Sequence, residues 1–480
     1  MILPCGITTS CLDVGIPEDT AVNDVFVTDR EVYVPNFFKD RVPDELDYGG
    51  RKVNILIKED ELYRREWAPY EEGNTVLSKE IYNRNRQLEK ELGIILNFKP
   101  YEGTNEAMNC EIQTAGKNGS GEYDIISNRA SHAASVDILP YYMDLNDKNS
   151  MTYLYLNKSH WNRSYIDSAE CYGRLYTCVG IASFSVYDHT MAVFYNRAEA
   201  ESRLGYSLYD RVLEDLWTYE TFYNLVAELH DDMGTEDMSD DFYGLYGSGA
   251  TAVDGFLYSM GTSPVEFYDD GTAGVTEGYK YKRLENVYLK TDALWQTKGA
   301  VLKEDDAFSD FLSGNTLFYT DVIYKSAEHN RLIREMEDGY GILPLPKYGT
   351  EQTYYASGVA DNYNVMSVMH HWNQDFEMVS ATLELLNDYS QSMVQPFYIE
   401  EIVKGENMDA TSCSVFNLII YGLRWNFSDI YGGDRVNARE VLWSIPLTDE
   451  ETPRLEDVIA DNKDQVNSEM KKIVDWLRNY

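Results

Sequence analysis

The sequence predicts an α/β protein of two or three domains, and three observations support this fold class. The chain has 480 residues, more than a single hydrophobic core usually serves. Hydrophobic residues make up 44% of it and charged residues 25%, a composition typical of folded soluble proteins. Short strand-like runs also alternate with helical runs across short joints, which is the pattern of a parallel sheet flanked by helices.

The alternating elements begin after residue 50. A β-branched run at residues 52–58 follows two glycines and predicts the first strand. Apolar residues at helical spacing predict a helix over 78–92, which Gly93 ends. Further strands are predicted at 94–98 and 123–126. This order of strand, helix and strand favours parallel pairing.

The middle of the chain continues the same alternation. Residues 191–195 predict a strand and 197–203 a helix. The next helix begins at Trp217-Thr218, where the Thr218 side chain can act as the N-cap. We assign Trp217 a structural role, because a tryptophan at a helix start normally anchors packing.

Three features are predicted for the second half. Residues 267–271 have the composition of a hairpin turn. Residues 341–346 must be extended, since two prolines forbid a helix. Residues 466–477 place five apolar side chains on one stripe, which predicts an amphipathic closing helix.

The first 50 residues are predicted to be a truncated signal or tether and a linker. The start lacks the basic region and the apolar core of a complete signal peptide. Small residues nevertheless precede Cys11, as they do at the lipidation site of bacterial lipoproteins, so Cys11 is a candidate for lipidation. The alternative is an unstructured tail with an incidental cysteine. Residues 12–50 are acidic and turn-rich, as a linker would be.

The charge of the chain excludes some partners. Acidic residues number 81 and basic residues 41, giving a formal net charge of −40. Such a surface repels nucleic acid and anionic lipid. The 39 tyrosines and 8 tryptophans suit the apolar faces of sugars, although most of them must serve packing.

No catalytic, metal or cofactor motif is present. Residues 247–249 read Gly-Ser-Gly but lack the rest of a phosphate loop and of a nucleophile elbow. His370 and His371 are adjacent, so one helix face cannot present both to zinc, and we expect surface histidines. The acidic tract at 231–241 lacks the ligand spacing of a calcium loop. We therefore predict neither an enzyme nor a cofactor.

The cysteines leave one alternative open. No pair has the CxxC spacing of a metal or redox site. Cys171 and Cys178 flank a tight turn and could form a disulfide in an oxidising compartment; buried free thiols are the alternative.

Five segments, in order, resemble family 1 extracellular solute-binding proteins. The stretch WTYETF at 217–222 is similar to the family's WTwdeF helix start, and GILPLPKY at 341–348 to its return strand. Residues 361–364 follow the family pattern only loosely, and 395–431 resemble a subset from anaerobic gut-type Gram-positive bacteria. The other segments that carry the resemblance are 161–166 with 172–176, 192–197 and 311–318.

The resemblance implies a two-lobed periplasmic-binding-protein-like fold of type II, each lobe a mostly parallel sheet flanked by helices. It implies an N-terminal lobe at 51–195, a C-terminal lobe at 196–345, and a hinge return with mixed-lobe helices at 346–480. The implied protein is a monomeric, lipid-anchored receptor outside the cell that delivers a carbohydrate, most simply an oligosaccharide, to an ABC transporter permease. The alternatives are a secreted carbohydrate-active enzyme, a glycan-adhesion module, and a same-fold receptor for peptides or other polar solutes.

Ligand contacts in such lobes come from loops at the carboxyl ends of strands. This rule selects Glu59 and Asp60 after the first strand, and Ser127, Asn128 and Arg129 after the strand at 123–126.

The remaining candidate residues follow the family resemblance. Trp161 is predicted to be a stacking platform, with a lobe-surface or core tryptophan as the alternative. Trp425 is a further aromatic candidate for which core packing is favoured. Four more residues are predicted to line the hinge and the second lobe: Tyr187, Asp188, Tyr319 and Asp321.

Overall fold

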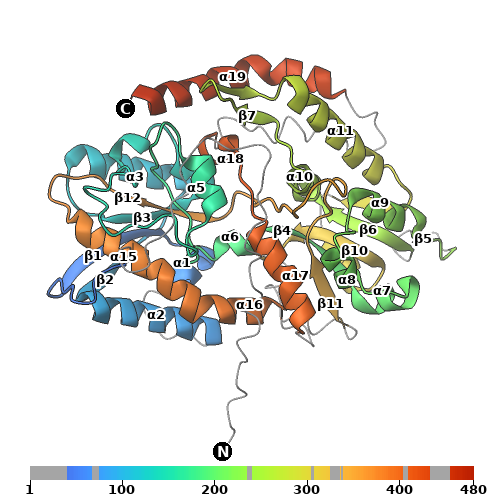
Figure 1. Cartoon of the computed structure of the whole chain (residues 1–480), viewed down its shortest axis with the longest axis horizontal. Helices are drawn as coiled ribbons and strands as arrows, with labels where there is room; N and C mark the ends of the chain where they lie inside the picture. Colours follow the sequence, from blue (N-terminus) through green and yellow to red (C-terminus); the bar gives the residue numbers. More distant parts are fainter. Residues whose placement is uncertain are drawn as a thin grey trace, which may run out of the picture.

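The computed structural model describes residues 41–67, 75–234, 241–303, 307–324, 336, 339–403, 409–432 and 454–479. Two separate sheets, each flanked by helices, form two lobes that lie side by side (Figure 1). The α/β, two-lobed fold is therefore confirmed.

The first lobe is built on four strands in the order β12-β3-β1-β2. They are β1 (Arg51–Lys58), β2 (Ile94–Tyr101), β3 (Ile125–Arg129) and β12 (Asn364–Val368). β1 is parallel to β2 and β3, whereas β12 is antiparallel to β3. Consecutive residues Ile55, Leu56 and Ile57 are all buried, because helices cover both faces of the sheet.

Capping residues set the bounds of the helix between the first two strands. At the start of α2 (Val76–Leu92) the Thr75 side-chain oxygen accepts the Ser78 backbone N–H, and the Ser78 hydroxyl oxygen accepts the Thr75 backbone N–H. Gly93 ends α2 with φ 58°, a conformation that a side chain would strain. The helix predicted at 78–92 is confirmed.

The second lobe is built on a mixed sheet in the order β11-β4-β10-β6-β5, with β9 also paired to β6. β10 runs parallel to β6, whereas β4 is antiparallel to both of its neighbours, β10 and β11. The strands are β4 (Met191–Asn196), β5 (His230–Asp231), β6 (Phe242–Ser248), β9 (Ala300–Lys303), β10 (Thr316–Val322) and β11 (Tyr340–Leu343).

The predicted packing role of Trp217 is confirmed. Its side chain is 0% exposed, its indole N–H donates to the Pro344 carbonyl at 2.8 Å, and its ring packs on Phe318. Thr218 caps α9 (Tyr219–Glu228) by accepting the backbone N–H of Thr221 at 3.3 Å, as predicted.

The predicted hairpin and closing helix are also present. β7 (Val265–Phe267) and β8 (Ala273–Val275) pair antiparallel around the predicted turn. The closing helix is α19 (Leu455–Asn479), which runs along the top of the molecule in Figure 1. The remaining helices are α1 (Glu61–Trp67), α3 (Asn105–Asn118), α4 (Ala130–Ala133), α5 (Arg163–Ala169), α6 (Ser185–Asp188), α7 (Arg197–Leu204), α8 (Leu208–Leu213), α10 (Gly249–Ser259), α11 (Gly278–Trp295), α12 (Ala307–Leu312), α15 (Phe376–Tyr389), α16 (Gln395–Val403), α17 (Ala410–Tyr421) and α18 (Phe427–Tyr431), together with short turns at Leu139–Tyr141 and Ser390–Val394.

The end of the predicted linker packs on the first lobe. Val42 is buried, and the backbone N–H groups of Tyr48 and Gly50 donate to the carbonyls of Leu92 and Gly93 at 2.8 and 2.6 Å. These bonds satisfy carbonyls that the end of α2 would otherwise leave unpaired. Residues 1–40, including Cys11, lie outside the described part of the chain.

The structure decides the open alternative for Cys171 and Cys178 and corrects one expectation about the histidines. Cys171 and Cys178 are both buried free thiols, one of the two alternatives stated above; burial raises the pKa of each thiol. Of the two expected surface histidines, only His370 is exposed. His371 is buried, with its Nε2 3.7 Å from an Asp124 carboxylate oxygen.

A buried polar network joins the first lobe to the segment that crosses to the second. The Glu66 carboxylate, at the end of α1, accepts the backbone N–H of Ser185 and the Asn364 side-chain amide, the latter at 2.7 Å. Arg84 donates to the Glu66 backbone carbonyl at 3.0 Å. Burial raises the pKa of Glu66 to about 7 and lowers the pKa of Arg84 to about 9. The network thus ties α1, α2, α6 and β12 together.

The raised pKa of Glu66 predicts that stability falls as the pH rises. Between about pH 4.5 and 7 the folded state retains the Glu66 proton that the unfolded chain has lost. Across this range the free energy of unfolding should therefore fall by at most about 3 kcal/mol. Glu66→Gln resembles the protonated side chain and should reduce this fall in stability with pH. Urea unfolding from pH 4.5 to 8 measures the effect.

Glu102→Gln, at an exposed carboxyl group, is the matched control. An unchanged pH dependence in Glu66→Gln would contradict the assignment of the proton to Glu66.

Candidate functional site

Predicted ligand residues of the first lobe meet at one edge of its sheet. The predicted strand at 123–126 is displaced: β3 spans Ile125–Arg129, so Ser127, Asn128 and Arg129 lie in the strand and not after it. Because β1 and β3 are parallel, with Ile57 opposite Ser127, residues 59–60 after β1 and Arg129 at the end of β3 lie at the same edge of the sheet. The Arg129 guanidinium lies 3.3 Å from the Asp361 carboxylate, on the segment that leads into β12. Arg129 therefore lies at the carboxyl end of its strand, next to an acidic partner that the strand-end rule did not select, and its contact with a ligand stays a prediction.

The second lobe contributes His189 and Tyr324 at the matching position. His189 precedes β4 and Tyr324 follows β10, and these strands are antiparallel neighbours, with Met191 opposite Val322. The two rings lie parallel, with an interplanar angle of 5° and centroids 6.2 Å apart. We call Arg129, His189, Tyr324 and Asp361 the inter-lobe cluster.

Electrostatics connect the two halves of this cluster. Burial lowers the pKa of His189, although the carboxylates of Asp188 and Asp361 oppose the change and Arg129 adds to it. His189 is therefore neutral at pH 7. Its Nδ1 lies 2.9 Å from the Ser185 carbonyl, which can only accept, so Nδ1 carries the proton and Nε2 is an acceptor.

The inter-lobe cluster can bind a polar ligand in two ways. The Arg129 guanidinium donates hydrogen bonds, whereas the Asp361 carboxylate and His189 Nε2 accept them. The partly exposed Tyr324 adds an aromatic ring with a polar tip. Hydroxyl groups, which both donate and accept, match this set.

Trp161 lies inside the first lobe in this conformation. Its side chain is 3% exposed, and its indole N–H donates to the Glu384 carboxylate at 2.9 Å. The ring also lies against His160, with centroids 5.7 Å apart. No face of Trp161 is open for stacking here, so its role as a ligand platform stays a prediction.

Asn128 and Ser127 are buried beneath the same edge. The Asn128 side-chain amide donates to Asn109 at 2.9 Å, and its oxygen accepts the Arg129 backbone N–H. Ser127 accepts the Trp67 indole N–H at 3.1 Å. These bonds support the loop that carries Arg129 rather than pointing into solvent.

Tyr187 and Asp188 form part of α6, where the chain crosses between the lobes. Asp188 makes an ion pair with Arg65 and accepts the Tyr398 hydroxyl at 2.8 Å. Tyr187 packs on the same Tyr398 ring, with centroids 5.6 Å apart. Both side chains are buried, and their predicted role in lining the hinge stays a prediction.

The other candidates differ in how well their polar atoms are satisfied. Tyr319 is buried and donates its hydroxyl to Asp321. Glu59 pairs with Arg64 at 2.8 Å. Trp425 is 5% exposed and packs on Tyr165, and its indole N–H has no hydrogen-bond acceptor among the described residues. A buried donor without an acceptor makes Trp425 the stronger candidate for a ligand or water contact.

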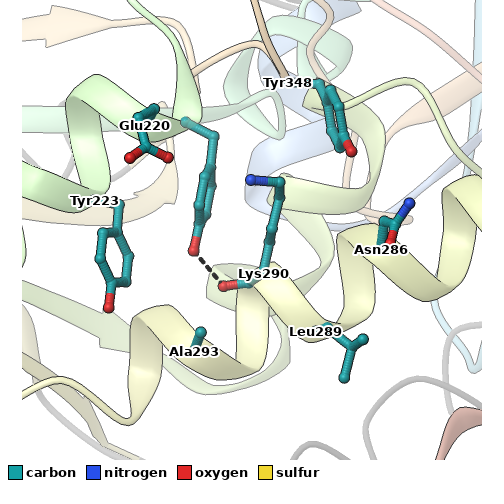
Figure 2. Close-up of a pocket in the computed structure, with 8 residues that line it drawn as sticks. Glu220, Tyr223, Asn286, Leu289, Lys290, Ala293 and Tyr348 are labelled. Carbon is teal, nitrogen blue, oxygen red and sulfur yellow. Dashed lines mark hydrogen bonds between the residues drawn. The ribbon is translucent and has the colours of Figure 1, made fainter.

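A separate hollow of about 370 Å³ lies on the second lobe, between α9 and α11 (Figure 2). The Tyr219 hydroxyl donates to the Lys290 carbonyl, and the Lys290 ammonium lies 4.4 and 5.3 Å from the rings of Tyr219 and Tyr348. These groups satisfy one another, and none of them belongs to the inter-lobe cluster.

The described residues contain no group of three or more His, Cys, Asp or Glu side chains that could hold a metal ion. None of the described helices combines the length and the apolar character needed to cross a bilayer.

Trp161→Ala should mainly destabilise the protein. Removing a buried tryptophan typically lowers the free energy of unfolding by about 3–5 kcal/mol. Tyr324→Ala, at a partly exposed ring, should cost less than about 1.5 kcal/mol. Urea unfolding of both variants checks this. A stable Trp161→Ala protein that fails to bind its ligand would instead support the stacking role of Trp161.

The fold has known counterparts among solved structures, although no protein-family model and no curated protein match the sequence. The sugar-binding protein MalE of Xanthomonas citri has a TM-score of 0.59 at 13% identity, over 89% of this chain and 100% of that one. M. tuberculosis UspC has a TM-score of 0.56 at 13% identity, over 87% of this chain and 100% of that one. The galacto-N-biose-/lacto-N-biose I-binding protein of the Bifidobacterium longum ABC transporter has a TM-score of 0.54 at 14% identity, over 88% of this chain and 98% of that one. The chain therefore shares the two-lobed α/β fold of these binding proteins.

Proposed function

We propose that this protein is an extracytoplasmic receptor that binds a carbohydrate between its lobes and delivers it to an ABC importer. The observation that carries the proposal is the inter-lobe cluster, in which groups suited to hydroxyls converge from both lobes. The fold supports it, because similar structures are described in complex with lacto-N-biose, cycloalternan and maltotetraose.

Lobe closure would supply the signal to the transporter. Arg129 and Asp361 belong to the first lobe, whereas Tyr324 follows a strand of the second. A ligand that contacts both sides stabilises the closed arrangement over an open one, since only the closed form makes both sets of contacts. Closure also removes water from the ligand, which strengthens each hydrogen bond.

The charge of the protein favours a neutral ligand. A net charge of −40 disfavours anions, and the Arg129 guanidinium is already partnered by Asp361. A neutral oligosaccharide meets both conditions. The proposal also includes a monomeric state, a membrane permease as partner, and attachment outside the cell through Cys11.

Binding of a neutral sugar should raise the melting temperature, because a ligand specific for the native state stabilises it by mass action. The test is a thermal-shift screen with mono- and oligosaccharides, followed by calorimetry on the best ligand and product analysis of the same samples. Tyr324→Ala should weaken affinity about tenfold, which corresponds to the loss of one aromatic contact.

Tyr223→Ala, in the surface hollow of Figure 2, is the matched aromatic control and should leave affinity unchanged. Release of hydrolysed sugar would contradict the receptor function and indicate an enzyme. A rise in melting temperature with peptides alone would support a receptor but contradict a carbohydrate ligand.

A further inference from the structure

The closing helix α19 is anchored to the second lobe along its first part. Its apolar stripe, which includes Val466 and Met470, is buried. The Asn467 side-chain oxygen accepts the backbone N–H of Val275 in β8 at 2.9 Å, and the Lys463 ammonium pairs with Glu277 just before α11 at 2.5 Å. These contacts fix α19 to the hairpin of β7 and β8.

The end of α19 reaches the first lobe. The Trp476 ring lies against Tyr176, with centroids 5.5 Å apart. The guanidinium of Arg478 donates to the Tyr172 hydroxyl at 2.6 and 3.0 Å. Both tyrosines belong to the first lobe, because the same loop bonds to β12 through the backbones of Cys178 and Met366 at 2.9 Å.

Tyr172 completes a three-way contact with the hairpin turn. Its hydroxyl donates to the Gly271 carbonyl at 2.7 Å, and the same carbonyl accepts from Arg478 at 3.1 Å. One hydroxyl therefore links a loop of the first lobe, the hairpin of the second lobe and α19. The Tyr172 ring also packs on Phe267 in β7, with centroids 6.4 Å apart.

A tight turn of the backbone presents Tyr172 to this contact. Tyr172 and Gly173 both have positive φ, 54° and 78°, and the backbone N–H groups of Cys171 and Arg174 donate to each other's carbonyls at 3.0 Å. Positive φ at both central residues is the geometry of a two-residue hairpin turn, so the turn itself accounts for the conformation. The Tyr172 side chain, which is 43% exposed, is held by its hydrogen bonds to Gly271 and Arg478.

We propose that α19 and the β7–β8 hairpin form a strap that restrains separation of the two lobes. Figure 1 shows α19 extending over both lobes, while α6, where the chain crosses between them, lies below. Further opening about the crossing segments would pull Tyr172 away from Gly271 and Arg478. The strap therefore biases the ligand-free protein toward the conformation described here, whichever ligand the lobes hold.

The test measures lobe separation without any ligand. Spin labels at the exposed Cys110 of the first lobe and at Glu201→Cys on α7 of the second report the distance by pulsed electron resonance, with Cys5→Ser and Cys11→Ser to limit the labelling. Tyr172→Phe keeps the ring but loses the three hydrogen bonds that the hydroxyl makes with Gly271 and Arg478. It should increase the population with a longer distance by about threefold to tenfold.

Two further variants keep the test decisive. Tyr279→Phe, at a tyrosine that is 77% exposed on α11, is the matched control and should leave the distances unchanged. Tyr172→Gly removes the side chain and relieves the positive-φ strain, so it should open the lobes at least as far as Tyr172→Phe without unfolding the turn. Distances identical to the unmodified chain in both Tyr172 variants would overturn the strap. Because no sugar is used, failure of the strap and failure of the proposed receptor function are distinguishable.

Discussion

The relation between the two lobes depends on one buried carboxylate, Glu66. It accepts hydrogen bonds from the first residue of α6 and from the first residue of β12, which lie on two of the segments that run between the lobes. Water is excluded there, so each partner that fails to reach Glu66 would leave a costly unpaired group. The crossing is thereby held to one geometry, and Asp188 and His189, which follow directly, take their positions from it.

The crossing at α6 also positions part of the inter-lobe cluster. His189 is four residues beyond Ser185, the first residue of α6, and its Nδ1 donates to the Ser185 carbonyl, so its tautomer follows from the same turn. Arg129 reaches the cluster from the end of β3, and Asn128 holds its loop. The cluster therefore combines one well-supported edge of the first sheet with Tyr324 from the second, as a site between moving lobes requires.

The crossing and the strap act on different sides of the molecule. The buried network around Glu66 holds the crossing at α6, whereas α19, in the strap proposed above, would limit how far the lobes separate. Such a strap would supply part of the free energy of closure from the protein itself. A ligand then needs less differential affinity to shift the population.

The sequence by itself determined the elements and the edge of the sheet that carries Arg129, because these depend on local periodicity, capping residues and the direction of parallel strands. It did not separate Trp161 from a surface tryptophan, since its partner Glu384 lies 223 residues away and residue type carries no information about such a contact. His189, Tyr324 and Asp361 were missed for the same reason, although each lies within three residues of a predicted site residue or in a segment that had been singled out. Only the tertiary structure decided which strand-end side chains are buried as supports and which meet between the lobes, because that choice depends on how two sheets with separate cores are held against each other.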